Sequence, residues 1–144
     1  MVRVLFYFLL LIGVAAYAVS RGGRDERIAA WTCVAASFGS LALLATQTAY
    51  YSGLEQGVAI IDFATLLTFM WIALRSHRFW PLWVAGLQLT ATTGHVLKFV
   101  EPDLLPVVYA ASLASWSYAI LLIIAIGTWR GAHDGASTAR ISLS

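Results

Sequence analysis

The chain has 144 residues and a formal net charge of +2, with 60% of its residues hydrophobic and 11% charged. Soluble domains carry about a quarter charged residues, so this composition excludes a soluble globular domain. The arginines stand beside apolar runs and form no basic patch in the sequence, which excludes nucleic acid as a partner.

Five runs of the sequence are apolar and have about the 20 residues that a helix needs to cross the hydrocarbon core of a bilayer. The connectors between them are short and polar, so consecutive helices are expected to be antiparallel. The predicted fold class is all-α, a polytopic transmembrane bundle of five antiparallel membrane-spanning helices. The five spans are residues 4–20, 28–51, 58–74, 79–100 and 104–129.

The first span, residues 4–20, has an alternative interpretation as a cleaved secretory signal. Arg3 precedes its apolar core, and the core ends in the A-x-A pattern of residues 16–18. Cleavage there would place the three arginines of the next connector outside the cell, against the rule that positively charged connectors stay in the cytoplasm. We therefore treat this segment as a membrane span.

The second span, residues 28–51, contains Cys33, which is the only cysteine of the chain. A single cysteine excludes an internal disulfide and a cysteine metal cluster. The third span, residues 58–74, contains Asp62, a carboxylate within an otherwise apolar run.

The fourth and fifth spans carry small residues at intervals of four. Small residues at this spacing let membrane helices approach closely. Because a connector of residues 101–103 joins the two spans, we predict that they pack against each other, antiparallel, along these stripes. The stripes are Gly86, Thr90 and Gly94 on the fourth span, and Ala111, Ser115 and Ala119 on the fifth.

The last fifteen residues, 130–144, are rich in Gly, Ala, Ser and Thr. Such a segment has little to bury, so we predict a flexible cytoplasmic tail. Residues 1–129 are predicted to form a single transmembrane helical domain.

Lysine and arginine alternate between the two sides of the predicted bundle. Arg3 and Lys98 fall on one side, and the other seven of the nine basic residues fall on the opposite side. Cytoplasmic connectors hold the excess of positive charge, which predicts a bacterial inner membrane protein with its N-terminus outside and its C-terminus in the cytoplasm. The seven are Arg21, Arg24, Arg27, Arg75, Arg78, Arg130 and Arg140.

Two ionisable residues lie inside predicted spans, Asp62 and His95. At 1.5 Å per helical residue, Asp62 is about 6 Å from the start of its span and His95 about 7 to 8 Å from the outer end of its own, so they share a depth. Ionisable groups at such positions mark ligand or proton sites by default. We predict a shallow, outward-facing polar pocket formed by Asp62, His95, Gln47, Lys98 and Tyr109.

Two other interpretations of Asp62 remain open. It pairs with Lys98 or His95 only to satisfy a buried charge, or it reaches toward the surface without a partner. A lone intramembrane histidine cannot supply two axial ligands to a haem, and the ligands are too few for a metal. No cofactor and no metal are therefore predicted.

The sequence contains no nucleophile-elbow, phosphate-binding or zinc-protease motif, so no enzymatic activity is predicted. The first hypothesis is a non-enzymatic accessory or oligomer-forming component of the membrane. Its expected partners are the lipid bilayer and either a second copy or another membrane protein. The alternative is a small carrier or sensor of a solute or of protons that uses the pocket around Asp62 and His95.

Overall fold

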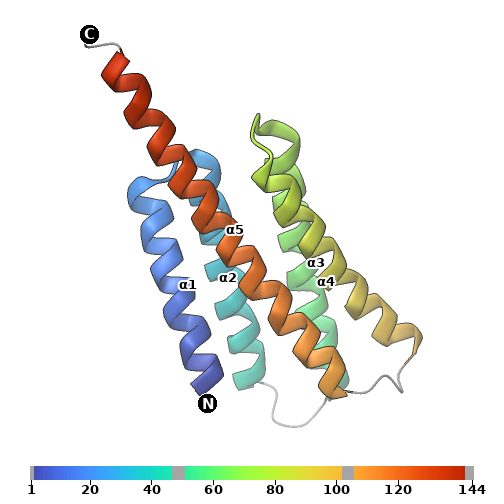
Figure 1. Cartoon of the computed structure of the whole chain (residues 1–144). Coiled ribbons are helices and arrows are strands. Elements are labelled where there is room, and N and C mark those ends of the chain that lie inside the picture. Colours follow the sequence, from blue (N-terminus) through green and yellow to red (C-terminus); the bar gives the residue numbers. More distant parts are fainter. Residues whose placement is uncertain (1, 47–50, 102–105, 142–144) are drawn as a thin grey trace.

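The computed structural model describes residues 2–46, 51–101 and 106–141, although some side chains within these ranges lie outside the description (Figure 1). The described residues are helical except at two short turns and at Glu101, which confirms the all-α prediction. They form five helices: α1 (Val2–Arg21), α2 (Arg24–Thr46), α3 (Tyr51–Arg75), α4 (Trp80–Val100) and α5 (Pro106–Ile141).

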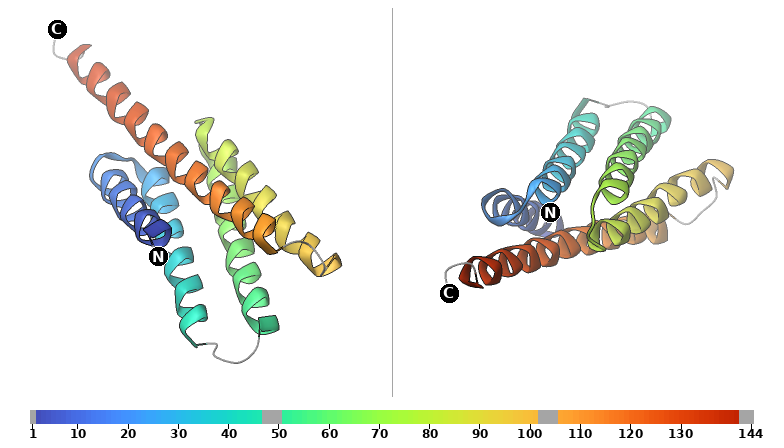
Figure 2. Two further views of the ribbon diagram at one scale, coloured as in Figure 1. Left: turned by 60° about the horizontal axis from the view of Figure 1, so that its bottom comes forward. Right: turned by 90° about the horizontal axis from the view of Figure 1, so that it is seen from above.

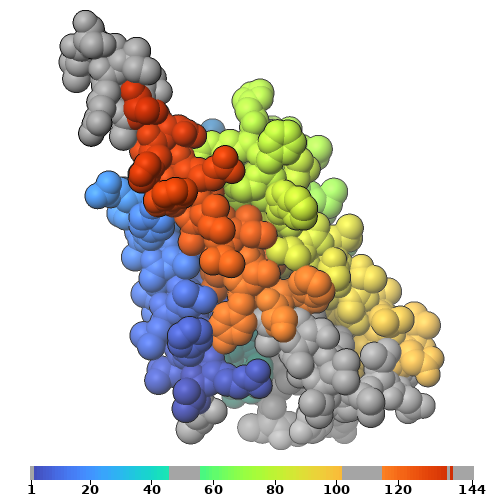
Figure 3. Space-filling model, in the orientation of Figure 1, coloured from blue at the N-terminus to red at the C-terminus, as the bar shows by residue number. Residues whose placement is uncertain are grey.

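Consecutive helices run in opposite directions. The α1–α2 turn and the α3–α4 turn lie at one end of the bundle, whereas the N-terminus of α1 lies at the other end (Figure 1). We call the end of the bundle that holds the two turns the arginine end, because Arg21, Arg24, Arg75 and Arg78 lie in or beside these turns. Figure 2 shows α5 lying across one side of the other helices, and it packs mainly against α1 and α4. Its side chains fill the space between these two neighbours in Figure 3.

Three helical segments are long and apolar enough to cross a membrane: Val2–Arg21, Arg24–Ala45 and Gln56–Arg75. The fully described α4 is not among them, because Gln88, His95, Lys98 and three threonines dilute its apolar residues. The structure therefore supports an all-helical protein with three candidate spans, and the prediction of five spans is not confirmed by it.

The last helix is longer than the sequence predicts. The predicted span ends at Trp129, but α5 continues through Arg130 to Ile141 and passes beyond the arginine end (Figure 1). The segment contains no proline, and an interior glycine such as Gly131 or Gly135 costs a helix only about 1 kcal/mol relative to alanine. The polar composition of residues 130–141 therefore did not predict where α5 ends.

The apolar core occupies the half of the bundle next to the arginine end. On every helix its members lie within about 15 Å of that end, measured along the helix axis. Cys33 belongs to this core as a free, buried thiol. The other members are Leu11, Val14, Ala18, Ala29, Ala30, Phe69, Ile72, Val84, Ile120, Leu121 and Ile124.

Candidate functional site

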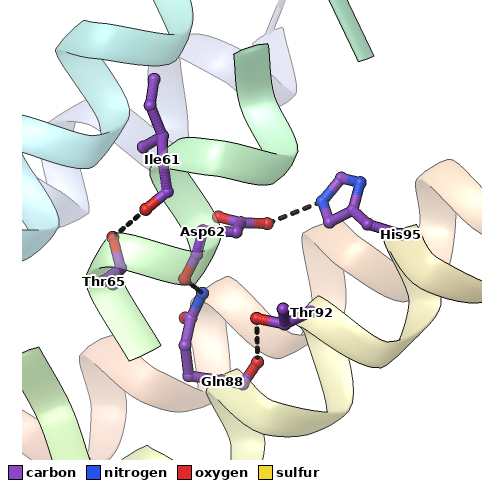
Figure 4. A network of polar contacts seen from close by, with 6 residues as sticks. All are labelled: Ile61, Asp62, Thr65, Gln88, Thr92 and His95. Atoms are coloured by element: carbon purple, nitrogen blue, oxygen red, sulfur yellow. Dashed lines mark hydrogen bonds and ion pairs between the residues drawn. The ribbon is translucent and has the colours of Figure 1, made fainter. Parts of the chain in front are cut away.

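The structure brings Asp62 of α3 and His95 of α4 into direct contact. Nε2 of His95 lies 2.6 Å from Oδ2 of Asp62 (Figure 4). The side chain of His95 is 6% exposed and that of Asp62 is 23% exposed. Of the two partners that the sequence suggests for this carboxylate, His95 is the one that the structure pairs with it.

The pair sits in the half of the bundle away from the apolar core. Along the helix axes, Asp62 lies about 20 Å from Arg75, and His95 lies about 22 Å from Trp80. The two residues come from antiparallel helices joined by a short turn, so equal distances from that turn place them side by side. Helical rise predicts that Asp62 and His95 share a depth, and the two side chains are in contact at that depth.

The buried face of α4 that carries His95 is polar over two turns. Gln88 and Thr92 precede His95 at helical spacing, and all three are buried. Nε2 of Gln88 donates a hydrogen bond of 3.3 Å to the backbone oxygen of Asp62, as Figure 4 shows. The hydroxyl of Thr92 donates to the carbonyl of Gln88 on its own helix at 2.9 Å. The α3–α4 contact is therefore held by satisfied polar groups at this level.

The remaining members of the predicted pocket are only partly described. Lys98 lies one turn beyond His95 on α4, is half-buried and has an interaction of its own. Gln47 lies outside the described residues, and Tyr109 lies in α5 with its side chain outside the description. Whether these side chains converge on Asp62 stays a prediction.

Two tyrosines that the sequence analysis did not single out make polar contacts in the same half of the bundle. The hydroxyls of Tyr7 on α1 and Ser37 on α2 lie 2.9 Å apart. The hydroxyl of Tyr118 on α5 donates a hydrogen bond of 3.2 Å to the backbone oxygen of Arg3. The rings of Tyr7 and Tyr118 pack edge to face with their centroids 5.6 Å apart. A tyrosine inside an apolar run was the available signal, because a buried hydroxyl needs a partner.

At Gly86 and Thr90, the small-residue stripe predicted on α4 does not form the α4–α5 contact. Gly86 and Thr90 are exposed, and a Cβ at Gly86 would meet nothing within 4 Å. The prediction is therefore wrong at these two positions. The buried face with Gln88 and His95 points into the bundle, and the stripe on the opposite face consequently points outward.

The other stripe residues lie at intermediate or exposed positions. Gly94 and Ala119 are half-buried, Ser115 is exposed, and the side chain of Ala111 is outside the description. Among the side chains that the structure describes, the contact between α4 and α5 lies nearer the arginine end. It includes Trp80 and Val84 on α4, and Ile120, Leu121, Ile124 and Gly127 on α5.

A partly buried ion pair at the arginine end was also missed by the sequence analysis. Nη1 of Arg78 in the α3–α4 turn lies 2.5 Å from Oε1 of Glu26 in the first turn of α2. The Glu26 side chain is only 3% exposed, whereas that of Arg78 is 45% exposed. A Cβ at Gly131 of α5 would overlap the Arg78 guanidinium, so three parts of the chain meet at this ion pair. We call Glu26, Arg78 and Gly131 the end clamp.

Neither cluster has the composition of a metal site among the residues that the structure describes, because no three His, Cys, Asp or Glu side chains come together there. The Asp62–His95 pair places an imidazole nitrogen and a carboxylate oxygen at hydrogen-bond distance. The end clamp has no obvious chemistry beyond holding helices together. Comparison with models of protein families, with curated proteins and with solved structures finds no match to this chain.

Proposed function

We propose that the chain is a small multi-pass integral membrane protein of non-enzymatic type that serves as an accessory or oligomer-forming component of the membrane. The observation that carries this proposal is the outward-facing surface of α4. Gly86, Thr90 and Thr93 are exposed on it, and the Thr90 and Thr93 hydroxyls are bonded only to carbonyls of their own helix in the contacts described.

Such a surface is better suited to another helix than to lipid. Glycine and threonine offer lipid tails little surface for van der Waals contact, whereas small residues four apart allow the backbone of a second helix to approach closely. The polar inner face of α4 adds to the argument, because it leaves this helix less apolar than the three candidate spans. A protein neighbour on the outer face would remove α4 from contact with lipid.

We take a second copy of the chain as the neighbour. Two copies inserted in the same direction present the same stripe at the same depth, so Gly86 and Thr90 of one copy meet their counterparts in a parallel helix pair. Because the stripe carries no charge, such pairing brings no like charges together.

Replacing Gly86 with leucine is expected to abolish this association, because the added side chain separates the two backbones. Gly13→Leu on α1 is the matched control, since a Cβ at Gly13 also meets nothing within 4 Å. The measurement is the mass of the complex by native mass spectrometry and energy transfer between labelled copies in liposomes. A dimer or larger complex is expected for the wild type and Gly13→Leu, and a monomer for Gly86→Leu. A monomeric wild type, or equal masses for both variants, would contradict the proposal.

The proposal includes the predicted topology in a bacterial inner membrane, with five spans, the N-terminus outside and the C-terminus in the cytoplasm. It is supported by the antiparallel order of the helices and by the arginines of both turns at one end. Arg3 and Lys98 are the two basic residues at the other end.

The topology predicts where reporters fused to the chain are active. A cytoplasmic reporter, such as a fluorescent protein that does not mature outside the cell, is expected to be bright when fused after Ser144. An enzyme that requires the outer compartment is expected to be active when fused before Met1. Activity of the outer-compartment enzyme at Ser144 would show an even number of crossings or the reverse orientation.

A second candidate function is a small carrier or sensor of a solute or of protons. It is favoured by the contact between Asp62 and His95, because an ionisable pair at membrane depth is costly and is usually kept for function. Asp62 is also 23% exposed, so the carboxylate is not sealed in the bundle as His95 is.

A further inference from the structure

The contact between Asp62 and His95 has the geometry of a shared proton. A separation of 2.6 Å between nitrogen and oxygen is that of a short, charge-assisted hydrogen bond, and it admits a hydrogen atom but no larger ion. One proton therefore lies between the two side chains, whichever of them it is formally assigned to.

The charge of the pair depends on how many protons it holds in total. Carboxyl and imidazole offer three places for a proton: the carboxylate and the two ring nitrogens. With two protons the pair is neutral, either as carboxylate and imidazolium or as carboxylic acid and imidazole. With one proton it carries a negative charge. Loss or gain of a single proton thus changes the net charge at this point of the α3–α4 contact.

We infer that the Asp62–His95 pair is a reversible binding site for one proton, and that the two residues titrate as a unit. This inference deepens the second candidate function and rests on it. A net charge is costly at membrane depth, so the neutral pair and the negative pair differ strongly in free energy. The proton whose loss converts the neutral pair into the negative pair is bound by both residues together.

The surroundings of the pair are consistent with proton binding. Lys98 lies one turn away on α4, and Tyr7 of α1 is within electrostatic reach of Asp62. Cys33 of α2 and Tyr118 of α5 are also within electrostatic reach of Tyr7. Of these four side chains, only Lys98 is of a type that is normally charged at neutral pH. The proton reaches the pair through the carboxylate, because Asp62 is 23% exposed and His95 only 6%.

The experiment follows the ring of His95 by nitrogen NMR as the pH is changed. The chain has three histidines, and the other two, His77 and His133, are exposed. A chain with His77→Gln and His133→Gln therefore leaves His95 as the only signal. The sample is the full chain in lipid nanodiscs. Infrared spectra of the same chain, labelled in its aspartate carboxyls, follow its four aspartates, and Asp25→Asn, Asp103→Asn and Asp134→Asn identify the bands that do not belong to Asp62.

The ring signal and an aspartate carboxyl band are expected to change together, at one pH midpoint. Asp62→Asn, which keeps the shape of the side chain, is expected to move the midpoint of His95 by at least about one pH unit, a tenfold change in proton affinity. Asp134→Asn, the same change at an exposed residue of α5, is expected to leave the midpoint in place.

Three results would overturn the inference. The first is a His95 ring that does not change between about pH 4 and pH 9. The second is a midpoint unchanged by Asp62→Asn. The third applies if that variant fails to fold: a carboxyl band of the unsubstituted Asp62 that changes at a different pH from the ring. A pair that titrates as expected, in a chain whose transport and signalling are unaffected by Asp62→Asn, would contradict the carrier or sensor function alone.

Discussion

Replacing Arg78 with methionine is expected to lower the free energy of unfolding by about 1 to 3 kcal/mol, the usual cost of leaving a buried polar group without its partner. Methionine keeps most of the length of the side chain but not its charge. Glu26 would then remain as a carboxylate that is 3% exposed and has lost its cation. The measurement is unfolding in mixed detergent micelles, followed by circular dichroism.

Two further variants isolate the role of the ion pair. Arg75→Met, one turn earlier in the chain, removes an exposed arginine that stacks on the ring of Trp71, and is expected to cost less than about 1 kcal/mol. Adding Glu26→Gln to Arg78→Met is expected to recover about 1 kcal/mol or more, because a neutral amide leaves no buried charge. Equal losses for Arg75→Met and Arg78→Met would show that Glu26 and Arg78 contribute no more than surface charges.

Replacing Gly127 with alanine is expected to lower the free energy of unfolding by about 1 to 3 kcal/mol, the typical cost of overpacking a core. A Cβ at Gly127 would lie 2.9 to 3.0 Å from three ring carbons of Trp80. Such distances are shorter than carbon contacts in real structures, and the rigid ring cannot yield without moving α4 away from α5. The same micelle unfolding measures the loss.

Gly135→Ala is the matched control, because it makes the same substitution in the same helix. A Cβ at Gly135 meets nothing within 4 Å, so only the helix propensity changes, and the variant is expected to be unchanged or more stable by up to about 1 kcal/mol. Comparable losses at Gly127 and Gly135 would mean that α5 does not pack on Trp80 as described.

For the Asp62–His95 contact, the sequence predicts the depth of the two residues but not the choice of partner. Helical rise is the same in every helix, and a short turn aligns the ends of its two neighbours, so residues at equal distances from that turn share a depth. His95 and Lys98 are nevertheless almost equally good candidates by depth. Only the rotation of α4 about its own axis distinguishes them, and this rotation turns His95 toward Asp62.

For the stripe of small residues on α4, the sequence led to a wrong prediction. The sequence separates a face with Gly86 and Thr90 from a face with Gln88 and His95, but it does not indicate which face turns inward. Small residues predict close packing against another helix, and polar residues predict hydrogen-bond partners. Because α4 has a face of each kind, either face could be the one that turns inward. The polar face points inward because Asp62 and the backbone of α3 offer it hydrogen bonds.

Composition, apolar run length and helical rise are properties of each segment alone. They were enough for the all-helical class, the order of the helices, and the depth of Asp62 and His95. The end clamp and the direction of each helix face depend instead on contacts between segments far apart in the chain. Glu26 resembles any other acidic residue in a first helical turn until Arg78 and Gly131 meet around it, because burial is a property of the packed bundle and not of a local pattern.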